Sequence, residues 1–336
     1  MKSVPLLAID AGGTNCRAVL CSLDGSIIQY VEGGPCNYQS IGVTQAQENL
    51  TRVLWKLTNQ KEHGLSVNQV IIGIAGLDTS NDQIIIENFV KKSLLDTRIL
   101  AHNLLVNNDG IIALLGSIGE SPGIIVVSGT GSIVHGRSQD GTQMRAGGWG
   151  HRVGDEGSGY AIGQAALRHI FRATDGREPV SAIQHEILKE LQMGTIDDLM
   201  SWVYSDEYTV DRVASITPIL FSLAHGGDSI ALSILQRAGQ ELADASATVI
   251  QRLELTKAPF DIVTAGSILQ KDTLVADAMI RSLSDRFHDF RVTRSFDEPI
   301  YNVLLYGLSL LGDISEEIRD NCSRELLRVA KANGKT

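Results

Sequence analysis

The sequence is poor in cysteine, in basic charge and in long apolar runs. Its four cysteines show no CxxC spacing, which excludes a disulfide framework and favours a reducing cytoplasm. The apolar run near the start is too short for a signal peptide, and no stretch approaches the roughly 18 apolar residues of a membrane span. A net charge of −10 argues against general nucleic-acid binding. We therefore expect a cytoplasmic protein with neither nucleic acid nor membrane as its partner.

A signature of glycine and hydroxyl residues occurs twice, the second copy 116 residues after the first. In each copy an apolar run ends in a Gly/Thr turn, and a second strand and an Asp-Gly hairpin follow. The aligned pairs are Gly13 with Gly129, Thr14 with Thr130, Asp24 with Asp140 and Gly25 with Gly141. A duplicated hairpin that faces phosphate predicts two half-domains that hold one nucleotide in a cleft.

The order of elements predicts an α/β protein with two domains. Each half begins with three strands, after which strands and helices alternate, as in a mixed sheet flanked by helices. The later strands are expected at 70–74, 104–106, 260–265 and 291–296, and the main helices at 45–59, 82–94, 231–253 and 301–311. A chain of 336 residues also favours two cores. We place the first domain at 1–118 and the larger second domain at 119–336, with a helical insertion at about 160–255 and a last helix that could pack back on the first domain.

The two glycine turns are candidate phosphate-binding elements. Glycine lets the backbone N–H groups approach phosphate oxygens, Thr14 adds a hydroxyl donor, and Asp10 at the strand end suits a hydrated Mg²⁺. An ordinary glycine-rich hairpin is the alternative for the first turn alone. The second copy at 128–132 aligns with the first, and this favours the phosphate-binding interpretation for both turns.

Asp109 closes a strand at its presumed carboxyl end, where ligands bind in open α/β sheets. An ionised carboxylate there could accept the proton of a hydroxyl that attacks a phosphate. Asp is also a favoured helix cap, and local sequence alone favours a cap for the helix that starts at Gly110.

Three further segments carry candidate ligand contacts. The glycine-dense stretch 147–159 contains Asp155, which could bind sugar-type hydroxyls or stabilise the N-terminus of the following helix. Asn37 offers a donor and an acceptor but is also a common turn residue. Gly266-Ser267 could pack against a nucleoside or simply cap a helix.

Taken in order, these segments resemble the N-acetylglucosamine kinase branch of the sugar kinase/Hsp70/actin superfamily, which includes bacterial ATPases of the BadF/BadG/BcrA/BcrD type. The resemblance covers essentially the whole chain. It is most specific at 147–151 and 154–158, which are similar to the family's sugar-site loop, while 10–14 and 128–132 look like its two phosphate loops. It implies two ribonuclease H-like domains of the actin-like ATPase type with the active-site cleft between them.

The resemblance also implies an activity and a role for individual residues. The activity is transfer of the ATP γ-phosphate to the 6-hydroxyl of an amino sugar, with N-acetylglucosamine the expected substrate, Mg²⁺ the cofactor, a homodimer the assembly and Asp109 the base. The implied nucleotide contacts are Asp10 (also the Mg²⁺ ligand), Gly12, Gly13, Thr14, Asn15, Gly129, Thr130, Gly131, Gly266 and Ser267. The implied sugar contacts are Asn37, Gly76, Asp109, Gly148, Trp149 and Asp155.

The sequence departs from the family pattern at two places, and three other functions are considered. Gly110 stands where the family usually has alanine, and Pro299-Ile300-Tyr301-Asn302 replaces a Pro-x-x-Gly-Ala pattern. A glucosamine or other hexose kinase and a non-catalytic, nucleotide-gated protein are alternatives. An activator ATPase with a cluster-bridging cysteine is disfavoured, because no cysteine lies between Cys36 and Cys322.

Overall fold

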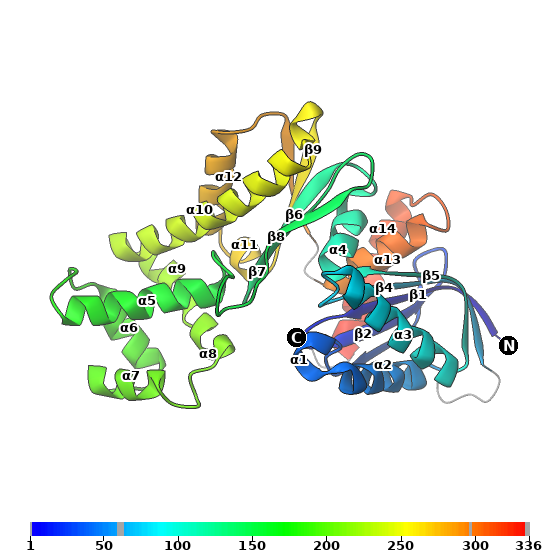
Figure 1. Cartoon of the computed structure of the whole chain (residues 1–336), viewed down its shortest axis with the longest axis horizontal. Helices are drawn as coiled ribbons and strands as arrows, with labels where there is room; N and C mark the ends of the chain where they lie inside the picture. Colours follow the sequence, from blue (N-terminus) through cyan, green and yellow to red (C-terminus); the bar gives the residue numbers. More distant parts are fainter. Residues whose placement is uncertain (1, 59–63, 296–297, 333–336) are drawn as a thin grey trace. The chain divides into compact units, whose positions relative to one another are not determined.

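The computed structural model describes residues 2–58, 64–295 and 298–332, and the chain divides into two compact units (Figure 1). Unit 1 comprises Met1–Ser121 and Ser295–Thr336, and unit 2 comprises Pro122–Arg294. The division thus falls after Ser121, and the chain from Ser295 onwards packs with the first unit.

The same sheet topology occurs in both units. One sheet has the order β3-β2-β1-β4-β5 and the other the order β8-β7-β6-β9-β10, with the first three strands antiparallel and the last two parallel to the central one. The strands of unit 1 are β1 (Lys2–Ala11), β2 (Cys16–Cys21), β3 (Ile27–Gly33), β4 (Leu65–Ile74) and β5 (Ile99–Asn108). Those of unit 2 are β6 (Gly123–Ser128), β7 (Ser132–Arg137), β8 (Gln143–Gly147), β9 (Phe260–Ala265) and β10 (Phe290–Arg294). The α/β fold with two mixed sheets is therefore confirmed.

The second turn of each repeat has the same hydrogen bonds. Asp24 Oδ1 accepts from the N–H of Ser26 at 3.0 Å, and Asp140 Oδ1 accepts from that of Thr142 at 3.1 Å. The glycines that follow the two aspartates have φ values of 84° and 86°. The predicted repeat is therefore a repeat of backbone geometry, because only a residue tolerant of positive φ fits after the aspartate.

Helices cover both faces of the sheet in unit 1. Its helices are α1 (Tyr38–Ile41), α2 (Val43–Leu57), α3 (Ser80–Asp96), α4 (Asp109–Ile118), α13 (Pro299–Ser309) and α14 (Glu316–Ala332). Alternate residues of β1 feed two separate cores: Leu7 lies with the buried residues of α2 and α3, and Leu6 with those of α4, α13 and α14. Residues 59 and 296, at the ends of a predicted helix and a predicted strand, lie outside the described residues.

Asn302, at the position where the resemblance predicts glycine, is buried near the start of α13. Its backbone packs so closely on α4 that a Cβ at Gly116 would overlap the Asn302 carbonyl. Its amide Nδ2 donates to Ser295 Oγ at 2.7 Å, and its Oδ1 accepts from Ser117 Oγ at 3.3 Å. A buried polar group costs free energy unless it is paired. These bonds explain how a buried asparagine is accommodated at the start of α13.

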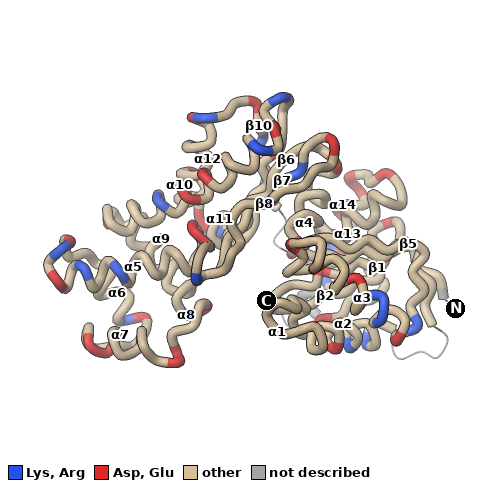
Figure 2. The backbone as a smooth tube through the Cα atoms, in the orientation of Figure 1, with Lys and Arg blue, Asp and Glu red and all other residues tan. Residues whose placement is uncertain are grey.

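Unit 2 contains one hydrophobic core built largely from the helical insertion. Its helices are α5 (Gly159–Thr174), α6 (Ala182–Glu190), α7 (Ile196–Val203), α8 (Val210–Ala214), α9 (Thr217–His225), α10 (Ser229–Arg252), the 3-10 turn η1 (Leu255–Lys257), α11 (Ser267–Gln270) and α12 (Leu274–Ser284). Figure 2 shows Lys and Arg interspersed with Asp and Glu along these elements. Within the described ranges, no helix combines the length and apolar character needed to cross a membrane.

Candidate functional site

The first glycine turn joins β1 to β2. The N–H of Gly12 donates to the carbonyl of Asn15 at 2.9 Å, and the carbonyl of Gly12 accepts from the N–H of Cys36 at 3.0 Å. Gly13, Thr14 and Asn15 are exposed, and a Cβ at Gly13 would meet nothing within 4 Å. Both backbone groups of Gly12 therefore maintain the turn, while the next three residues are accessible to a ligand.

Two candidate carboxylates lie at the carboxyl edge of the parallel strands of unit 1. Asp10 of β1 pairs in register with Gly73 of β4, which pairs with Asn107 of β5. Asp109 follows β5 directly, and its Cα lies 3.4 Å from the place of a Cβ at Gly73. The missing side chain at Gly73 lets α4 begin close against the sheet, which brings Asp109 to the same edge as Asp10.

Asp109 is not the cap of its helix. The N-cap of α4 is Asn108, whose Oδ1 accepts from the N–H of Gly110 at 2.8 Å. Asp109 is the first helical residue, and its Oδ1 accepts from the same N–H at 2.9 Å. The local prediction of a capping role was wrong, because the preceding asparagine is an equally good cap.

Burial and like charge make the Asp10 carboxylate costly to ionise. The pKa of Asp10 is raised from 3.8 to about 7: burial is the largest cause, the charge and hydrogen bond of Arg17 oppose it, and the charges of Asp109 and Glu298 add to it. Arg17 Nη1 donates to Asp10 Oδ2 at 3.0 Å, and its Nε lies 3.4 Å from Glu32 and 3.8 Å from Glu298. One guanidinium therefore compensates three carboxylates.

Asp109 also has a raised pKa. Burial is the main cause, the Gly110 N–H opposes it, and the charge of Asp78 adds to it. A base must be ionised yet basic enough to hold a proton, and a raised pKa improves the second property.

The two sugar candidates of unit 1 outside α4 lie against each other. Gly76 has φ 84°, and a Cβ there would lie 2.5 Å from Asn37 Oδ1. The same oxygen caps the short helix α1 by accepting from the N–H of Gln39 at 3.0 Å, while Gln39 Nε2 donates to the Gly76 carbonyl at 3.1 Å. The structure thus joins Asn37 and Gly76, and part of the hydrogen-bonding capacity of Asn37 serves the cap.

The second glycine turn joins β6 to β7 and meets the N-terminus of α5. The N–H of Gly129 donates to the Gly131 carbonyl at 2.9 Å. The N–H groups of Gly159 and Tyr160, in the first turn of α5, donate to the carbonyls of Gly129 and Thr130 at 2.8 and 3.2 Å. The positive end of the helix dipole thus lies beside this turn, which favours an anion there.

Asp155 connects the glycine-dense loop to the same turn. Its backbone has φ 62°, and its carboxylate accepts from the N–H groups of Ser132 and Gly150. A Cβ at Gly131 would lie 2.9 Å from Asp155 Oδ2. The N-cap of helix α5 is Ser158, and the interpretation of Asp155 as a charge that stabilises this N-terminus stays a prediction. Burial raises the pKa of Asp155, and these two amide donors lower it.

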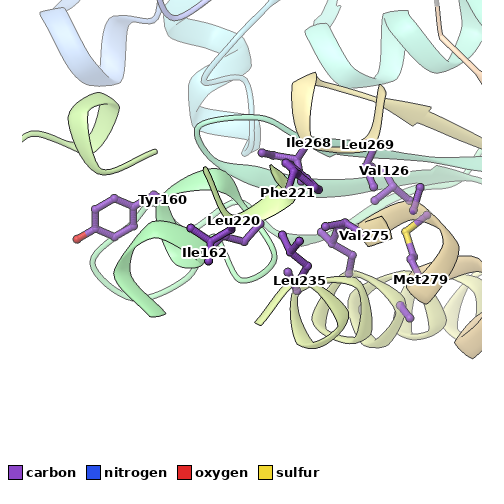
Figure 3. Close-up of a cluster of buried hydrophobic side chains, with 14 of the residues drawn as sticks. Val126, Tyr160, Ile162, Leu220, Phe221, Leu235, Ile268, Leu269, Val275 and Met279 are labelled. Carbon is purple, nitrogen blue, oxygen red and sulfur yellow. The ribbon is translucent and has the colours of Figure 1, made fainter. Parts of the chain in front are cut away.

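A pocket of about 480 Å³ lies within unit 2, beside the second turn. Three predicted nucleotide contacts, Gly129, Thr130 and Ser267, line it. Gly266, the N-cap of α11, has φ 87°, and a Cβ there would overlap the carbonyl of Ser128. Figure 3 shows Ile268 beside Phe221, and both side chains belong to the pocket wall and to the core.

The sequence did not reveal the other wall of this pocket. It is formed by residues of α8, α9 and the end of α11: Asp211, Ala214, Ser215, Thr217, Pro218, Lys271 and Asp272. Helices α8 and α9 belong to the insertion, and α11 follows β9. Apolar periodicity predicts that such helices pack but not what they pack against.

The described residues contain no group of three or more His, Cys, Asp or Glu side chains that could hold a metal ion. Asp10 could still serve a Mg²⁺ ion that is bound mainly by water and phosphate. Only one of its oxygens, Oδ2, is held by Arg17. The buried carboxylate therefore fits the predicted single protein ligand.

This duplicated sheet, with glycine turns after the first strand of each copy, is the architecture of an actin-like ATPase. The chain belongs to the BadF/BadG/BcrA/BcrD ATPase family, whose model matches residues 7–302.

Several proteins that this chain resembles are sugar kinases by name. The N-acetylmuramic acid/N-acetylglucosamine kinase of Clostridium acetobutylicum is 30% identical, with 90% of this chain and 98% of that protein covered. The N-acetyl-D-glucosamine kinase of Dictyostelium discoideum is also 30% identical, with coverage of 92% and 99%. The structure of a Chromobacterium violaceum protein, provisionally named an N-acetylglucosamine kinase, matches with a TM-score of 0.67, 25% identity and coverage of 90% and 98%.

The raised pKa of Asp10 predicts an unusual dependence of stability on pH. Folded Asp10 holds its proton more tightly than the unfolded chain does, so its contribution to stability is fully present below pH 3.8 and is lost as pH rises through about 7. Asp10→Asn removes this penalty. Its free energy of unfolding relative to wild type should increase by up to about 3 kcal/mol between pH 5 and 8, since a tenfold change in proton affinity corresponds to about 1.4 kcal/mol.

Urea denaturation of the metal-free proteins at both pH values measures this difference. Asp24→Asn is the matched control, because the Asp24 carboxylate is exposed and its pKa is lowered by hydrogen bonds from Ser26. A constant difference between Asp10→Asn and wild type across this range would contradict the prediction.

Proposed function

We propose that the protein transfers the γ-phosphate of ATP to the 6-hydroxyl of an amino sugar and converts N-acetylglucosamine to N-acetylglucosamine 6-phosphate. Family membership and the two relatives at 30% identity support this proposal. The observation that carries it is the state of Asp109: it is a partly buried carboxylate at the sheet edge, the helix cap is supplied by Asn108 instead, and its charge is close enough to Asp10 to raise the pKa of Asp10.

In the proposed reaction Asp109 acts as the base. The sugar oxygen forms a bond to the γ-phosphorus while the bond from that phosphorus to the β,γ-bridging oxygen breaks. The hydroxyl proton passes to Asp109, and ADP leaves with the electron pair. Asn37 and Gly76 in unit 1, and Gly148, Trp149 and Asp155 in unit 2, are the proposed sugar contacts.

The proposed ATP contacts belong to the two glycine turns and the pocket of unit 2. Gly13, Thr14 and Asn15 offer accessible groups, while Gly129, Thr130 and Gly131 lie at the N-terminus of α5, where phosphate is favoured. The pocket beside Gly266 and Ser267 has a volume in the usual range for ligands, about 300–1,000 Å³, and suits the adenosine.

We extend the proposal to the cofactor, the assembly and the location. Mg²⁺ bound near Asp10 would neutralise charge on the phosphates. A homodimer and a cytoplasmic location stay predictions; four buried free thiols agree with a reducing compartment. The same burial disfavours the activator-ATPase alternative, because a shared iron–sulfur cluster needs an accessible cysteine at the surface.

The first test is a coupled assay of ADP release with each of several acceptors. The acceptors are N-acetylglucosamine, N-acetylmuramic acid, glucosamine, N-acetylmannosamine, glucose and no sugar. We expect N-acetylglucosamine to stimulate ADP release most, with stoichiometric formation of the 6-phosphate. Preference for glucosamine or glucose would support the alternative hexose kinases. ADP release that no sugar stimulates would exclude the kinase and leave the nucleotide-gated alternative.

Replacement of the base gives the second test. Asp109→Asn keeps the shape of the side chain but cannot accept the proton, so kcat should fall to under about a tenth of the wild-type value while ATP still binds. Asp78→Asn is the control, because Asp78 affects Asp109 only through charge. It should retain turnover and move the acidic limb of the kcat/KM profile to lower pH. A value of kcat above that tenth in Asp109→Asn would remove Asp109 from the role of base.

The third test concerns the adenosine pocket. Ser215 is an exposed residue of the pocket wall whose hydroxyl donates only to the Arg212 carbonyl. Ser215→Phe should fill part of the pocket and raise the KM for ATP at least tenfold, with the sugar KM changed less than about twofold. Ser205→Phe is a matched control outside the pocket, since Ser205 is also exposed and also donates to the carbonyl three residues earlier. Equal ATP KM values in the two variants would place the adenosine elsewhere.

A further inference from the structure

Trp149 is a large aromatic side chain that is 66% exposed in the middle of the glycine-dense loop. Tryptophan is enriched at interfaces, because its ring offers a large apolar surface together with a polar N–H. Here the neighbour is Arg145 on β8, whose guanidinium carbon lies 4.1 Å from the centre of the indole ring. The cation therefore covers one face of the ring.

A hydrogen bond fixes the Arg145 side chain in this position. Its Nη1 donates to the carbonyl of Gly147 at 2.6 Å, in the last residue of β8. The planar guanidinium can therefore bond the backbone on one side and stack on the indole at the same time, which a lysine ammonium cannot do equally well. Arg145 thus connects the rigid end of the strand to the side chain of Trp149.

The surrounding loop restricts the Trp149 side chain near its Cβ atom. Gly148 has φ 68°, and a Cβ there would overlap Ile133 on β7. A Cβ at Gly154 would lie 3.1 Å from the Cβ of Trp149. The loop is therefore closed tightly around the start of the side chain, while the ring itself extends into solvent.

The strand opposite Arg145 does not repel it. His135 of β7 pairs in register with Arg145. Burial, aided by the charge of Arg145, lowers the pKa of His135 to about 4, so its imidazole is neutral at pH 7. The guanidinium is then the only one of the two side chains that carries a charge.

We propose that Arg145 is a positioning residue that holds the Trp149 indole by one face, so that the opposite face is presented as a platform for the pyranose ring of the sugar. The inference rests on the proposed function for the identity of the ligand. It assigns Arg145, which the sequence did not single out, to sugar affinity rather than to phosphoryl transfer. The C–H groups of a pyranose ring pack on such an indole face, and the cost of ordering the ring is met before the sugar binds.

Steady-state kinetics and fluorescence test this role together. Arg145→Met preserves chain length but removes the charge and the hydrogen bond, and it should raise the KM for N-acetylglucosamine about tenfold, with kcat and the ATP KM within about twofold. Arg145→Lys should give a smaller increase, because it keeps the cation. Acrylamide quenching of Trp149, taken as the difference from Trp149→Phe, should increase in Arg145→Met.

Two controls separate positioning from a general effect. Arg237→Met removes an exposed arginine on α10 whose ion pair with Glu241 spans 3.8 Å, and it should behave as wild type. In a Trp149→Ala background, Arg145→Met should have no further effect on the sugar KM, because the two residues act as one unit.

The outcomes are distinguishable. Unchanged sugar KM and unchanged quenching in Arg145→Met would overturn the inference. So would a tenfold increase that persists in the Trp149→Ala background, or an equal loss in kcat, ATP KM and thermal stability, which indicates a purely structural residue. If the wild type phosphorylates no sugar, the proposed function fails. The quenching comparison then decides alone whether Arg145 holds the indole.

Discussion

The structure of the candidate site depends on one electrostatic constraint, the burial of Asp10 beside a second carboxylate. Two negative charges at the edge of a buried sheet repel each other, and burial removes the water that would weaken the repulsion. Arg17 is the compensating charge, and it is shared with Glu32 and Glu298. The single positive charge of Arg17 does not neutralise all of these carboxylates. The site therefore favours a further cation, such as a metal ion that accompanies the phosphates of a nucleotide.

The duplication gives the two units the same hairpins but different chemistry. In unit 1 the edge of the sheet carries Asp10 and Asp109, which can bind a cation and accept a proton. In unit 2 the matching turn itself contains no carboxylate, and the Asp155 carboxylate that lies against it comes from the later loop; backbone amides, the N-terminus of α5 and a pocket lie beside the turn. The amides favour an anion and the carboxylates favour a cation or a proton. One hairpin geometry is therefore compatible with both halves of a phosphoryl-transfer reaction.

The sequence predicted what short-range patterns determine. The strands and both Asp-Gly turns follow from apolar runs and positive-φ glycines, and the strand at 260–265 has the predicted bounds. The role of Asp109 was not predictable locally, because Asn108 and Asp109 are equally good caps and only the structure shows which one serves. Arg17, Arg145 and the walls of the pocket were missed, because pairing across strands and packing of inserted helices are long-range properties. The predicted cleft, the ligand contacts and the dimer stay predictions.

Strand β1 explains how the chain can hold a costly carboxylate in place. Its residues alternate between two cores, so that Leu7 and Ile9 are buried on one face and Leu6 and Ala8 on the other. A strand fixed on both faces cannot shift to expose Asp10 to water without disrupting two cores. The electrostatic penalty is therefore retained in the folded protein instead of being relieved by a small movement. A site that must bind and release charged ligands benefits from this, because the groups that bind them are already in position.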